Sequence, residues 1–272
     1  MDTVAPGNIK DKPRRRPPAF FFALGRQRLP TEITVEGVTW RLRQPFKHDF
    51  FAATALYERV PATPNDPAGL PTLAVLKVQR TYPLCGLPVR WLGAYVARHE
   101  IAVYRALQGL QGIPRFLGAV GPTGFLHEYI PGCDLRKRPI LTAEYFLRFQ
   151  TLLSEMHQRH VAYVDSNKRE NILLGDDGRP WLIDFQISFL VRRGERGNFL
   201  VRWIFRRFVR ADWYHFYKHK TRFVRHACSP EDFTRARKRG FLHRLHRVVT
   251  RPLVILRRKI LARYDMDEAR WK

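Results

Sequence analysis

The sequence predicts an α+β fold in two parts, a small β-rich first half and a helix-led second half with a cleft between them. Two observations predict it. Short segments of alternating apolar residues crowd the first half, whereas the clearest helical spacing lies beyond residue 140. Hydrophobic residues make up 45% of the 272 residues, which is enough for a core and argues against global disorder. Clefts between two such parts are the usual place for ligand sites.

The first half begins with a basic, proline-rich stretch, residues 1–30, which we expect to form a mobile tail. TEITVEGVTWRLRQ then predicts a strand pair that turns at Glu36 and Gly37. FAATALYERV and TLAVLKVQR predict two further strands because they are rich in β-branched and aliphatic residues. Residues 91–110 predict a helix, since apolar residues recur there near helical spacing.

The second half starts with RFLGAV and GFLHEYI, which predict two short strands separated by Gly-Pro-Thr-Gly. Residues 142–159 predict the clearest helix, with Thr142 as its N-cap. One face of that helix is apolar, as a helix on a core requires; it carries Phe146, Phe149, Leu153 and Met156. NILLGDDGRPWLIDF predicts two short strands joined by an Asp-Asp-Gly-Arg turn.

Charge is the unusual feature of the composition. Lys and Arg total 49 against 24 Asp and Glu, a net charge of +25, which predicts an anionic partner: nucleic acid, an anionic membrane surface or a phosphorylated substrate. Cys85, Cys133 and Cys228 form no CxxC pair, which argues against a disulfide framework or structural zinc and favours a reducing cytosol. No stretch approaches 18 uninterrupted apolar residues. We therefore expect a cytoplasmic protein, peripheral at the inner face of the cell membrane.

Two charged residues could pair inside the first half. Lys77 stands in the middle of the apolar strand LAVLKVQ, where an ammonium needs either a partner or an exposed face. Glu100 lies in the following helix and could supply that partner. Each residue alone also fits a plainer reading, with Lys77 on the outer face of an alternating strand and Glu100 on a helix surface.

Polar residues of the second half suggest phosphotransfer. Asp165 and Asn171 flank a tight loop, and Asp184 follows an apolar strand. Phosphotransfer needs a carboxylate to orient or deprotonate an acceptor hydroxyl, and oxygen ligands for a Mg²⁺ that bridges phosphates. Lys168, between Asp165 and Asn171, is placed to neutralise a transferring phosphate. Each residue alone could cap a loop, but their ordered occurrence with Lys77 and Glu100 favours a joint role.

With these motifs the chain resembles the protein-kinase-like superfamily over roughly residues 33–190. LAVLK resembles the VAIK strand, HEYIPG the hinge, VDSNKREN the catalytic loop and DFQ the DFG motif. The nearest resemblance is to small bacterial kinases that phosphorylate Kdo or heptose of the lipopolysaccharide core. The resemblance implies a bilobal fold, with a β-rich N-lobe at 31–126, a hinge and catalytic part of the C-lobe at 127–190, and a shortened helical C-lobe that continues through 191–272.

The resemblance also implies ATP and Mg²⁺ as cofactors. Lys77 would contact the α- and β-phosphates of ATP and be held by Glu100. The backbone near Glu128 and Tyr129 would bind adenine, and Asp165 would be the catalytic base.

On the same resemblance, Asn171 and Asp184 would hold Mg²⁺. The chain departs from the family pattern in three ways that bear on activity. Residues 45–57, where the family carries a glycine-rich loop, contain no glycine, and Tyr163 replaces the catalytic-loop histidine. Asn171 also follows Asp165 by six residues, where the family loop usually has five. A catalytically inactive pseudokinase that binds a membrane or a partner is therefore an alternative.

The chain changes character after residue 191. Residues 192–272 hold 24 Lys and Arg against 7 Asp and Glu. The stretch NFLVRWIFRRFVRADWYHFYKHK mixes aromatic residues and arginines at helical spacing, as a membrane-surface helix does, and RPLVILRRKIL (251–261) repeats the theme. The aromatic residues that could enter a lipid interface are Phe199, Trp203, Phe208 and Trp213, and the arginines that could meet phosphate headgroups are Arg202, Arg206, Arg207 and Arg210. The alternative is that these aromatic residues pack inside the C-terminal part.

The sequence therefore favours an ATP-dependent phosphotransferase that acts on a sugar hydroxyl of a lipopolysaccharide-core-type glycolipid at the cytoplasmic membrane face. No APE motif follows Asp184, so an ordinary peptide-binding segment is absent and a non-protein, anionic acceptor such as a lipid-linked sugar is favoured. An atypical protein Ser/Thr kinase is an alternative, as is the pseudokinase. A nucleic-acid-binding protein is the weakest reading, because it leaves Asp165, Asn171 and Asp184 unexplained. The sequence does not indicate the oligomeric state.

Overall fold

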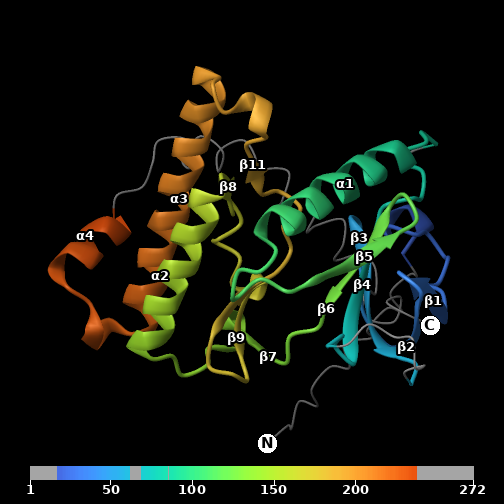
Figure 1. The fold of residues 1–272 in the computed structure, drawn as a ribbon, viewed down its shortest axis with the longest axis horizontal. Helices are drawn as coiled ribbons and strands as arrows, with labels where there is room; N and C mark the ends of the chain where they lie inside the picture. Colours follow the sequence, from blue (N-terminus) through green and yellow to red (C-terminus); the bar gives the residue numbers. More distant parts are fainter. Residues whose placement is uncertain (1–16, 62–68, 85, 238–272) are drawn as a thin grey trace, which may run out of the picture.

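A computed structural model describes residues 17–61, 69–84 and 86–237 of the chain. These residues fold into mixed α and β structure, with an antiparallel sheet on one side of the molecule and a group of helices on the other (Figure 1). The α+β class expected from the sequence is therefore confirmed.

The larger sheet contains six strands in the order β1-β2-β3-β4-β6-β5, and all neighbours are antiparallel. Its strands are β1 (Glu32–Val35), β2 (Val38–His48), β3 (Ala52–Arg59), β4 (Leu73–Gln79), β5 (Phe116–Val120) and β6 (Gly124–Glu128). The turn between β1 and β2 lies at Glu36 and Gly37, whose φ angles of 48° and 81° suit a two-residue hairpin turn. The strand pair predicted there is confirmed.

One long helix, α1 (Arg90–Leu107), crosses this sheet and packs against β4, β5 and β6 (Figure 1). The sheet has a core of its own, whose largest buried side chains are Trp40, Tyr57 and Leu76. Buried side chains near the end of α1, Tyr104 and Leu107 among them, belong instead to the core of the helical part. α1 thus contacts the sheet and contributes its buried side chains to the core of the helical part.

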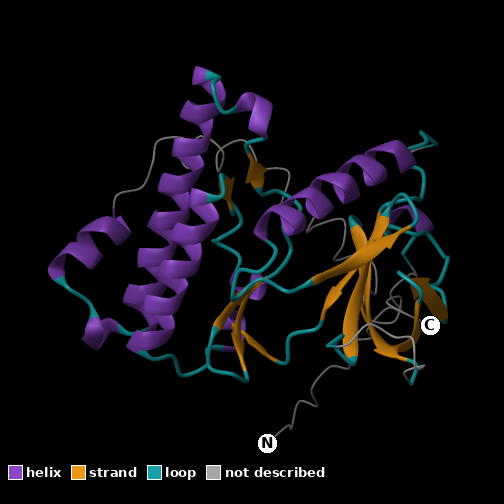
Figure 2. Cartoon of the chain, viewed as in Figure 1, coloured by secondary structure: helices purple, strands orange, loops and turns teal. Residues whose placement is uncertain are grey.

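The helical part is built on α2 (Ala143–Gln158) and α3 (Phe199–Phe223), which lie side by side (Figure 2). Its other elements are α4 (Pro230–Arg237), β7 (Gly132–Asp134), β8 (Val161–Ala162), β9 (Ile172–Gly175), β10 (Pro180–Leu182) and β11 (Phe189–Leu190). The described chain also forms five short 3-10 turns, of which η1 (Ala19–Phe21) precedes the sheet. The other four are η2 (Leu135–Lys137), η3 (Arg169–Asn171), η4 (Arg193–Glu195) and η5 (Arg225–Ala227). The β9-β10 hairpin and the helix α2 match their predictions.

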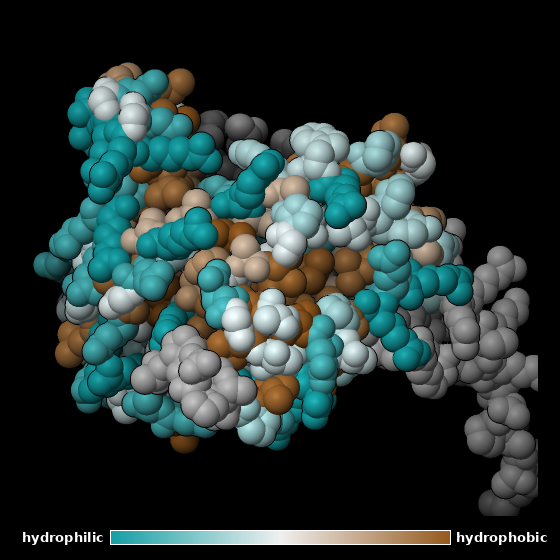
Figure 3. Space-filling view, turned by 45° about the vertical axis from the view of Figure 1, so that its right-hand side comes forward, coloured by the Kyte–Doolittle hydropathy of each residue, from teal (hydrophilic) through white to brown (hydrophobic). Residues whose placement is uncertain are grey.

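The start of α2 shows why the prediction succeeded. Thr142 lies just before the helix in an extended conformation, and its Oγ1 accepts a hydrogen bond of 3.2 Å from the amide of Tyr145. The predicted apolar face of α2 is buried in the helical core, with Phe149 at its centre against Phe216. An apolar band also crosses the middle of the molecule between more hydrophilic surfaces (Figure 3).

The expectation of a mobile tail is wrong for residues 17–30. The 3-10 turn η1 is followed by buried apolar residues, and the amide of Leu24 donates a hydrogen bond of 3.0 Å to His48 Nε2. The carbonyl of Ala23 accepts hydrogen bonds from the segment after β4. The reason is that the short apolar run in this stretch covers the end of the β2-β3 hairpin. The first sixteen residues lie outside the described part of the chain.

α3 divides the aromatic residues expected to face lipid. Phe208 packs against Phe189, with ring centroids 5.2 Å apart, and Trp213 packs against His157 of α2, with ring centroids 5.7 Å apart. The packing reading therefore holds for Phe208 and Trp213, whereas Phe199 and Trp203 are exposed. The run at 251–261 lies outside the described residues.

No helix in the described part of the chain is long and apolar enough to cross a membrane. Cys133 and Cys228 are free thiols, and Cys85 is not among the described residues.

Candidate active site

The first component of the site is a buried ion triad. β4 carries Lys77 into the interior, where its Nζ lies 2.7 Å from Glu100 Oε1 and 2.7 Å from Asp184 Oδ1. α1 supplies Glu100, which is fully buried, and Asp184 follows β10. The plainer readings of Lys77 and Glu100 as surface residues are therefore wrong, because each finds the other inside the protein.

Glu100 has further donors that hold it in place. Its Oε2 accepts a hydrogen bond of 2.8 Å from Gln79 Nε2, and its Oε1 accepts one of 3.1 Å from the amide of Phe185. A buried carboxylate is stable as an ion only when such donors surround it. Glu100 thus fixes both Lys77 and the backbone beside Asp184.

The charges within the triad set its ionisation. Burial alone would lower the pKa of Lys77, but the carboxylates of Asp184 and Glu100 outweigh it and raise that pKa. Burial alone would raise the pKa of Asp184, but the Lys77 ammonium outweighs it and lowers the pKa to about 2. Burial raises the pKa of Glu100 to about 7 against the pull of Lys77. Asp184 is therefore an anion at neutral pH, ready to hold a cation.

The second component is the loop from Asp165 to Asn171. Asp165 Oδ2 accepts a hydrogen bond of 2.9 Å from Asn171 Nδ2 and lies 2.7 Å from Lys168 Nζ. Two backbone hydrogen bonds, from the amide of Lys168 to Asp165 O and from the amide of Asn171 to Lys168 O, close the loop. Burial raises the pKa of Asp165, although Lys168 opposes that shift. Two of the three loop residues predicted from the sequence, Lys168 and Asn171, therefore bind the carboxylate of the third, Asp165.

Tyr163 ties this loop to the triad. Its buried hydroxyl lies 3.1 Å from Asn171 O and 2.6 Å from Ile183 O, the carbonyl just before Asp184. The residue that replaces the expected histidine thus holds both ends of the site at once.

The backbone at both ends of the site is strained. Val164 and Asp184 have φ angles of 67° and 63°, a region that residues with a Cβ rarely adopt. Each such residue costs about 1 to 3 kcal/mol, and a β-branched valine is the more unusual of the two. Strain of this kind persists only where the surrounding contacts enforce it, and it concentrates at functional sites.

Asp212, on α3, is the site residue that the sequence analysis missed. It is fully buried, and its carboxylate accepts hydrogen bonds from the amides of Tyr163 and Val164 at 2.8 and 2.9 Å. It also accepts from Ser166 Oγ and lies 3.1 Å from His157 Nε2. Asp212 thereby holds the loop on both sides of Asp165. The only signal in the sequence is a lone carboxylate among aromatic residues and arginines.

A column of aromatic side chains connects α1 to the two loops. The ring of Phe185 lies 4.9 Å from that of Tyr104 on α1 and 5.5 Å from that of Tyr163. His127 on β6 stacks on Tyr104 at 5.4 Å, and burial lowers its pKa to about 4, so it is neutral. A displacement of α1 would therefore displace Phe185, which packs on Tyr104, and with it the neighbouring Asp184.

The segment expected to bind adenine leaves β6 at Glu128. The amide of Glu128 donates to Arg115 O at 2.8 Å, and the amide of Tyr129 donates to Leu73 O at 3.2 Å. Both amides are used within the protein, so neither can donate to a nucleotide base in this structure. The ring of Phe46, from β2, lies 6.0 Å from that of Tyr129.

The glycine-free stretch forms the β2-β3 hairpin, and a carboxylate closes its turn. Asp49 Oδ1 accepts hydrogen bonds from the amides of Phe51 and Ala52 at 2.9 and 3.0 Å, and its Oδ2 lies 2.7 Å from Lys47 Nζ. These are the amides that a phosphate could otherwise bind. A phosphate at this turn would have to displace Asp49 or rely on Lys47.

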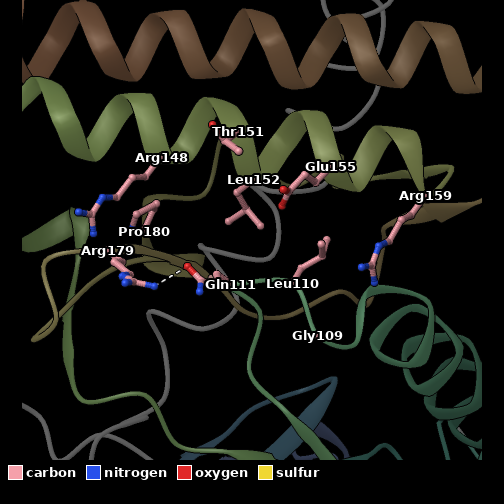
Figure 4. Close-up of a pocket in the computed structure, with 11 residues that line it drawn as sticks. Gly109, Leu110, Gln111, Arg148, Thr151, Leu152, Glu155, Arg159, Arg179 and Pro180 are labelled. Carbon is pink, nitrogen blue, oxygen red and sulfur yellow. Dashed lines mark hydrogen bonds between the residues drawn. The ribbon is translucent and has the colours of Figure 1, made fainter.

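A hollow of about 460 Å³ lies apart from these residues, between α2, the loop after α1 and the β9-β10 turn (Figure 4). Three arginines line it, and each already has a partner. Arg179 donates to Gln111, Arg148 pairs with Glu144, and Arg159 donates to backbone carbonyls. None of the predicted site residues lines this hollow. The chemistry therefore points to the triad and the loop as the candidate site.

Two histidines four residues apart on α3, His215 and His219, are both buried. The Nε2 of His219 lies 2.8 Å from Ser166 O in the Asp165–Asn171 loop. The described residues contain no group of three or more His, Cys, Asp or Glu side chains arranged to hold a metal. Any Mg²⁺ at Asn171 and Asp184 would therefore need further oxygens from its substrate.

A comparison with models of known protein families finds no match for this chain, and a search of curated proteins finds none. The functional interpretation accordingly depends on the geometry of the site.

Proposed function

We propose that this protein is an ATP-dependent phosphotransferase with a bilobal, protein-kinase-like fold. In this proposal residues 31–126 form the N-lobe and the chain from 127 forms the C-lobe. The acceptor is a sugar hydroxyl of a lipopolysaccharide-core-type glycolipid at the cytoplasmic membrane face. The observation that carries the proposal is that the Lys77–Glu100–Asp184 triad and the Asp165–Asn171 loop lie together, joined through Tyr163 and through the hydrogen bond from the amide of Ile183 to Asn171 O.

The donor set fits Mg²⁺. Asp184 offers an ionised carboxylate, and Asn171, whose amide nitrogen donates to Asp165, has an amide oxygen to offer. Mg²⁺ is usually bound by one or two protein oxygens together with phosphate oxygens. When bound, the ion neutralises charge that develops on the phosphates.

The protein's own residues then divide the work. Lys77 binds the α- and β-phosphates of ATP, held in place by Glu100. Asp165 accepts the proton of the acceptor hydroxyl, whose oxygen forms a bond to the γ-phosphorus while the bond from that phosphorus to the β–γ bridging oxygen breaks. ADP leaves with that bridging oxygen, and Lys168 neutralises the transferring phosphoryl group.

One observation favours the pseudokinase as a second candidate. Asp49 occupies the hairpin amides and brings a negative charge to the place where phosphates would bind. The pseudokinase differs from the first proposal in a measurable way, because it requires no nucleotide-dependent transfer.

The test measures Mg²⁺-dependent binding of ATP through the shift in melting temperature that it causes. Three proteins are compared: the wild type, Asp184→Asn and Asp176→Asn. Asp176 is an exposed carboxylate on the β9-β10 turn and serves as the matched control. Mg·ATP should raise the melting temperature of the wild type and the control but not of Asp184→Asn. No shift in any of the three proteins would sink the enzyme proposal and leave the pseudokinase.

The acceptor is tested separately by transfer of labelled phosphate. Lipopolysaccharide core fragments should be labelled by the wild type and not by Asp165→Asn. Labelling of a generic protein substrate in place of the fragments would identify an atypical Ser/Thr kinase instead.

A further inference from the structure

The beginning of α3 and the segment before it carry a dense positive charge. Residues 192–210 contain a single acidic residue, Glu195, and seven arginines: Arg192, Arg193, Arg196, Arg202, Arg206, Arg207 and Arg210. Apart from Arg207, which is half-buried, these arginines are exposed. Such a concentration of one sign attracts an anionic surface.

Large apolar side chains are exposed among these arginines. Phe199, Leu200 and Trp203 are 74%, 58% and 49% exposed, and they lie within the first five residues of α3. Single exposed apolar residues are ordinary, but a cluster rimmed by charge marks an interaction site. The top of the molecule, where α3 begins, mixes apolar and strongly hydrophilic residues (Figure 3).

Helical geometry places these residues on one face. With about 100° of rotation per residue, Phe199, Trp203 and Arg210 fall within about 40° of one another. The face widens to an arc of about 160° when it takes in its flanking members, which are Arg202, Arg206, Arg207 and Leu200. The guanidinium of Arg207 lies 5.8 Å from the centre of the Trp203 ring.

The opposite face of α3 packs into the protein. Phe205 contacts the rings of His157 and His160, and Phe208 contacts that of Phe189. Asp212 lies on this inner side, at the catalytic loop. The outer face is therefore left to solvent by the described residues while the inner face is fixed.

We propose that the outer face of α3 from Phe199 to Arg210 docks the protein on an anionic lipid bilayer. Apolar side chains enter the interface, and the arginines on the same arc meet phosphate headgroups. Aromatic residues and arginines also serve single-stranded nucleic acids, which bind by stacking on aromatic rings. The aliphatic Leu200 adds to insertion in lipid but offers nothing to stack on, which favours the bilayer.

Docking on this face has a consequence that rests on the proposed function. Asp212 lies thirteen residues after Phe199, about 20 Å along the helix, and on its far side. The helix itself, about 10 Å thick, then separates the catalytic loop from the lipid surface. The acceptor hydroxyl must stand clear of the bilayer, as it does on a glycolipid whose headgroup contains several sugars.

The test is co-sedimentation of the full chain with phosphatidylcholine vesicles with and without phosphatidylglycerol, in the absence of ATP. Two double variants probe the face: Phe199→Ser with Trp203→Ser, and Arg202→Gln with Arg206→Gln. We expect each to weaken binding to the anionic vesicles by roughly tenfold or more. Rising salt should weaken wild-type binding, and less so that of the arginine variant.

α1 offers matched controls, because its start also exposes aromatic residues and arginines. Trp91 and Tyr95 are 69% and 56% exposed, and Arg90 and Arg98 are exposed on the same helix. The corresponding double variants, to Ser and to Gln, remove the same chemistry and the same charge from another surface. They should leave vesicle binding unchanged within about twofold.

Several results would overturn the proposal. These are equal losses in the α1 and α3 variants, wild-type binding that does not depend on phosphatidylglycerol, and α3 variants that lose binding to a labelled oligonucleotide while keeping vesicle binding. The Asp184→Asn protein should bind vesicles normally, and the α3 variants should keep their Mg·ATP thermal shift. Failure of the docking face and failure of the phosphotransfer site are thus distinguishable.

Discussion

Replacement of Asp212 by asparagine should both destabilise the protein and loosen the Asp165–Asn171 loop. The carboxylate accepts from two backbone amides and the Ser166 hydroxyl, and it lies beside His157 Nε2. Asparagine keeps the shape but turns one acceptor oxygen into a donor that faces other donors. Loss of a charge-assisted hydrogen bond removes about 1.5 to 3 kcal/mol, and each buried group left unpaired costs about 1 to 3 kcal/mol. We expect the free energy of unfolding to fall by about 3 to 5 kcal/mol.

The assay is urea unfolding together with labelled-phosphate transfer, normalised to folded protein. Because Lys77 and Asp184 remain in place, the Mg·ATP thermal shift should persist. Transfer should fall on the order of a hundredfold, which corresponds to about 3 kcal/mol of lost positioning in the transition state.

Asp232→Asn is the matched control, because Asp232 is a buried carboxylate that accepts from Lys220 and from the amide of Ser229, away from the loop. It should lower stability and leave transfer by the folded fraction unchanged. An Asp212→Asn protein with the unfolding midpoint of the wild type would refute the stability reasoning. One that is destabilised yet transfers normally would refute the positioning role.

Three further predictions follow from the same geometry. Burial lowers the pKa of His127 and of His219 to about 4, below the ordinary 6.5, so the unfolded chain binds these protons more tightly than the folded one. Stability is therefore unaffected by these histidines above pH 6.5 and falls as the pH drops toward 4, by up to about 1.4 kcal/mol per pH unit for each histidine. Urea unfolding across this pH range should show the loss. A free energy of unfolding that does not change with pH would contradict it. Tyr163→Phe leaves Asn171 O and Ile183 O without their hydroxyl donor. We expect the free energy of unfolding to fall by about 1 to 3 kcal/mol in the same urea assay. An unchanged unfolding midpoint would contradict the proposed connection between the two loops through Tyr163. Asp49→Gly frees the hairpin amides and removes a negative charge, so the Mg·ATP thermal shift should grow; a smaller shift would mean that Asp49 aids nucleotide binding.

Local patterns were enough to predict most of the elements. The turn at Glu36 and Gly37, the cap at Thr142 and the apolar face of α2 depend on neighbours a few residues away, so the sequence displays them directly. The same patterns placed the boundaries of α1 and β4 to within about three residues. They failed for residues 17–30, because the basic, proline-rich composition of this stretch predicts a mobile tail. The short apolar run within it is buried against the β2-β3 hairpin, which no local pattern indicates.

The candidate site shows the same division. Asp165, Lys168 and Asn171 lie within seven residues, and their joint role could be inferred from that spacing. The meeting of Lys77 with Asp184 joins residues 107 positions apart, and only the order of motifs suggested it.

Tertiary structure alone decided the rest. An ammonium in an apolar strand is compatible with either face of a sheet, and burial of Lys77 became favourable only because Glu100 and Asp184 compensate its charge from other elements. Asp212 looks like any helical carboxylate until the fold brings the loop amides to it. The helical spacing of α3 permits several aromatic residues to face outward, and contacts with Phe189 and with His157 of α2 turned Phe208 and Trp213 inward. Sequence therefore determined the elements, whose causes are local, whereas burial and charge compensation between distant residues determined which side chains form the site.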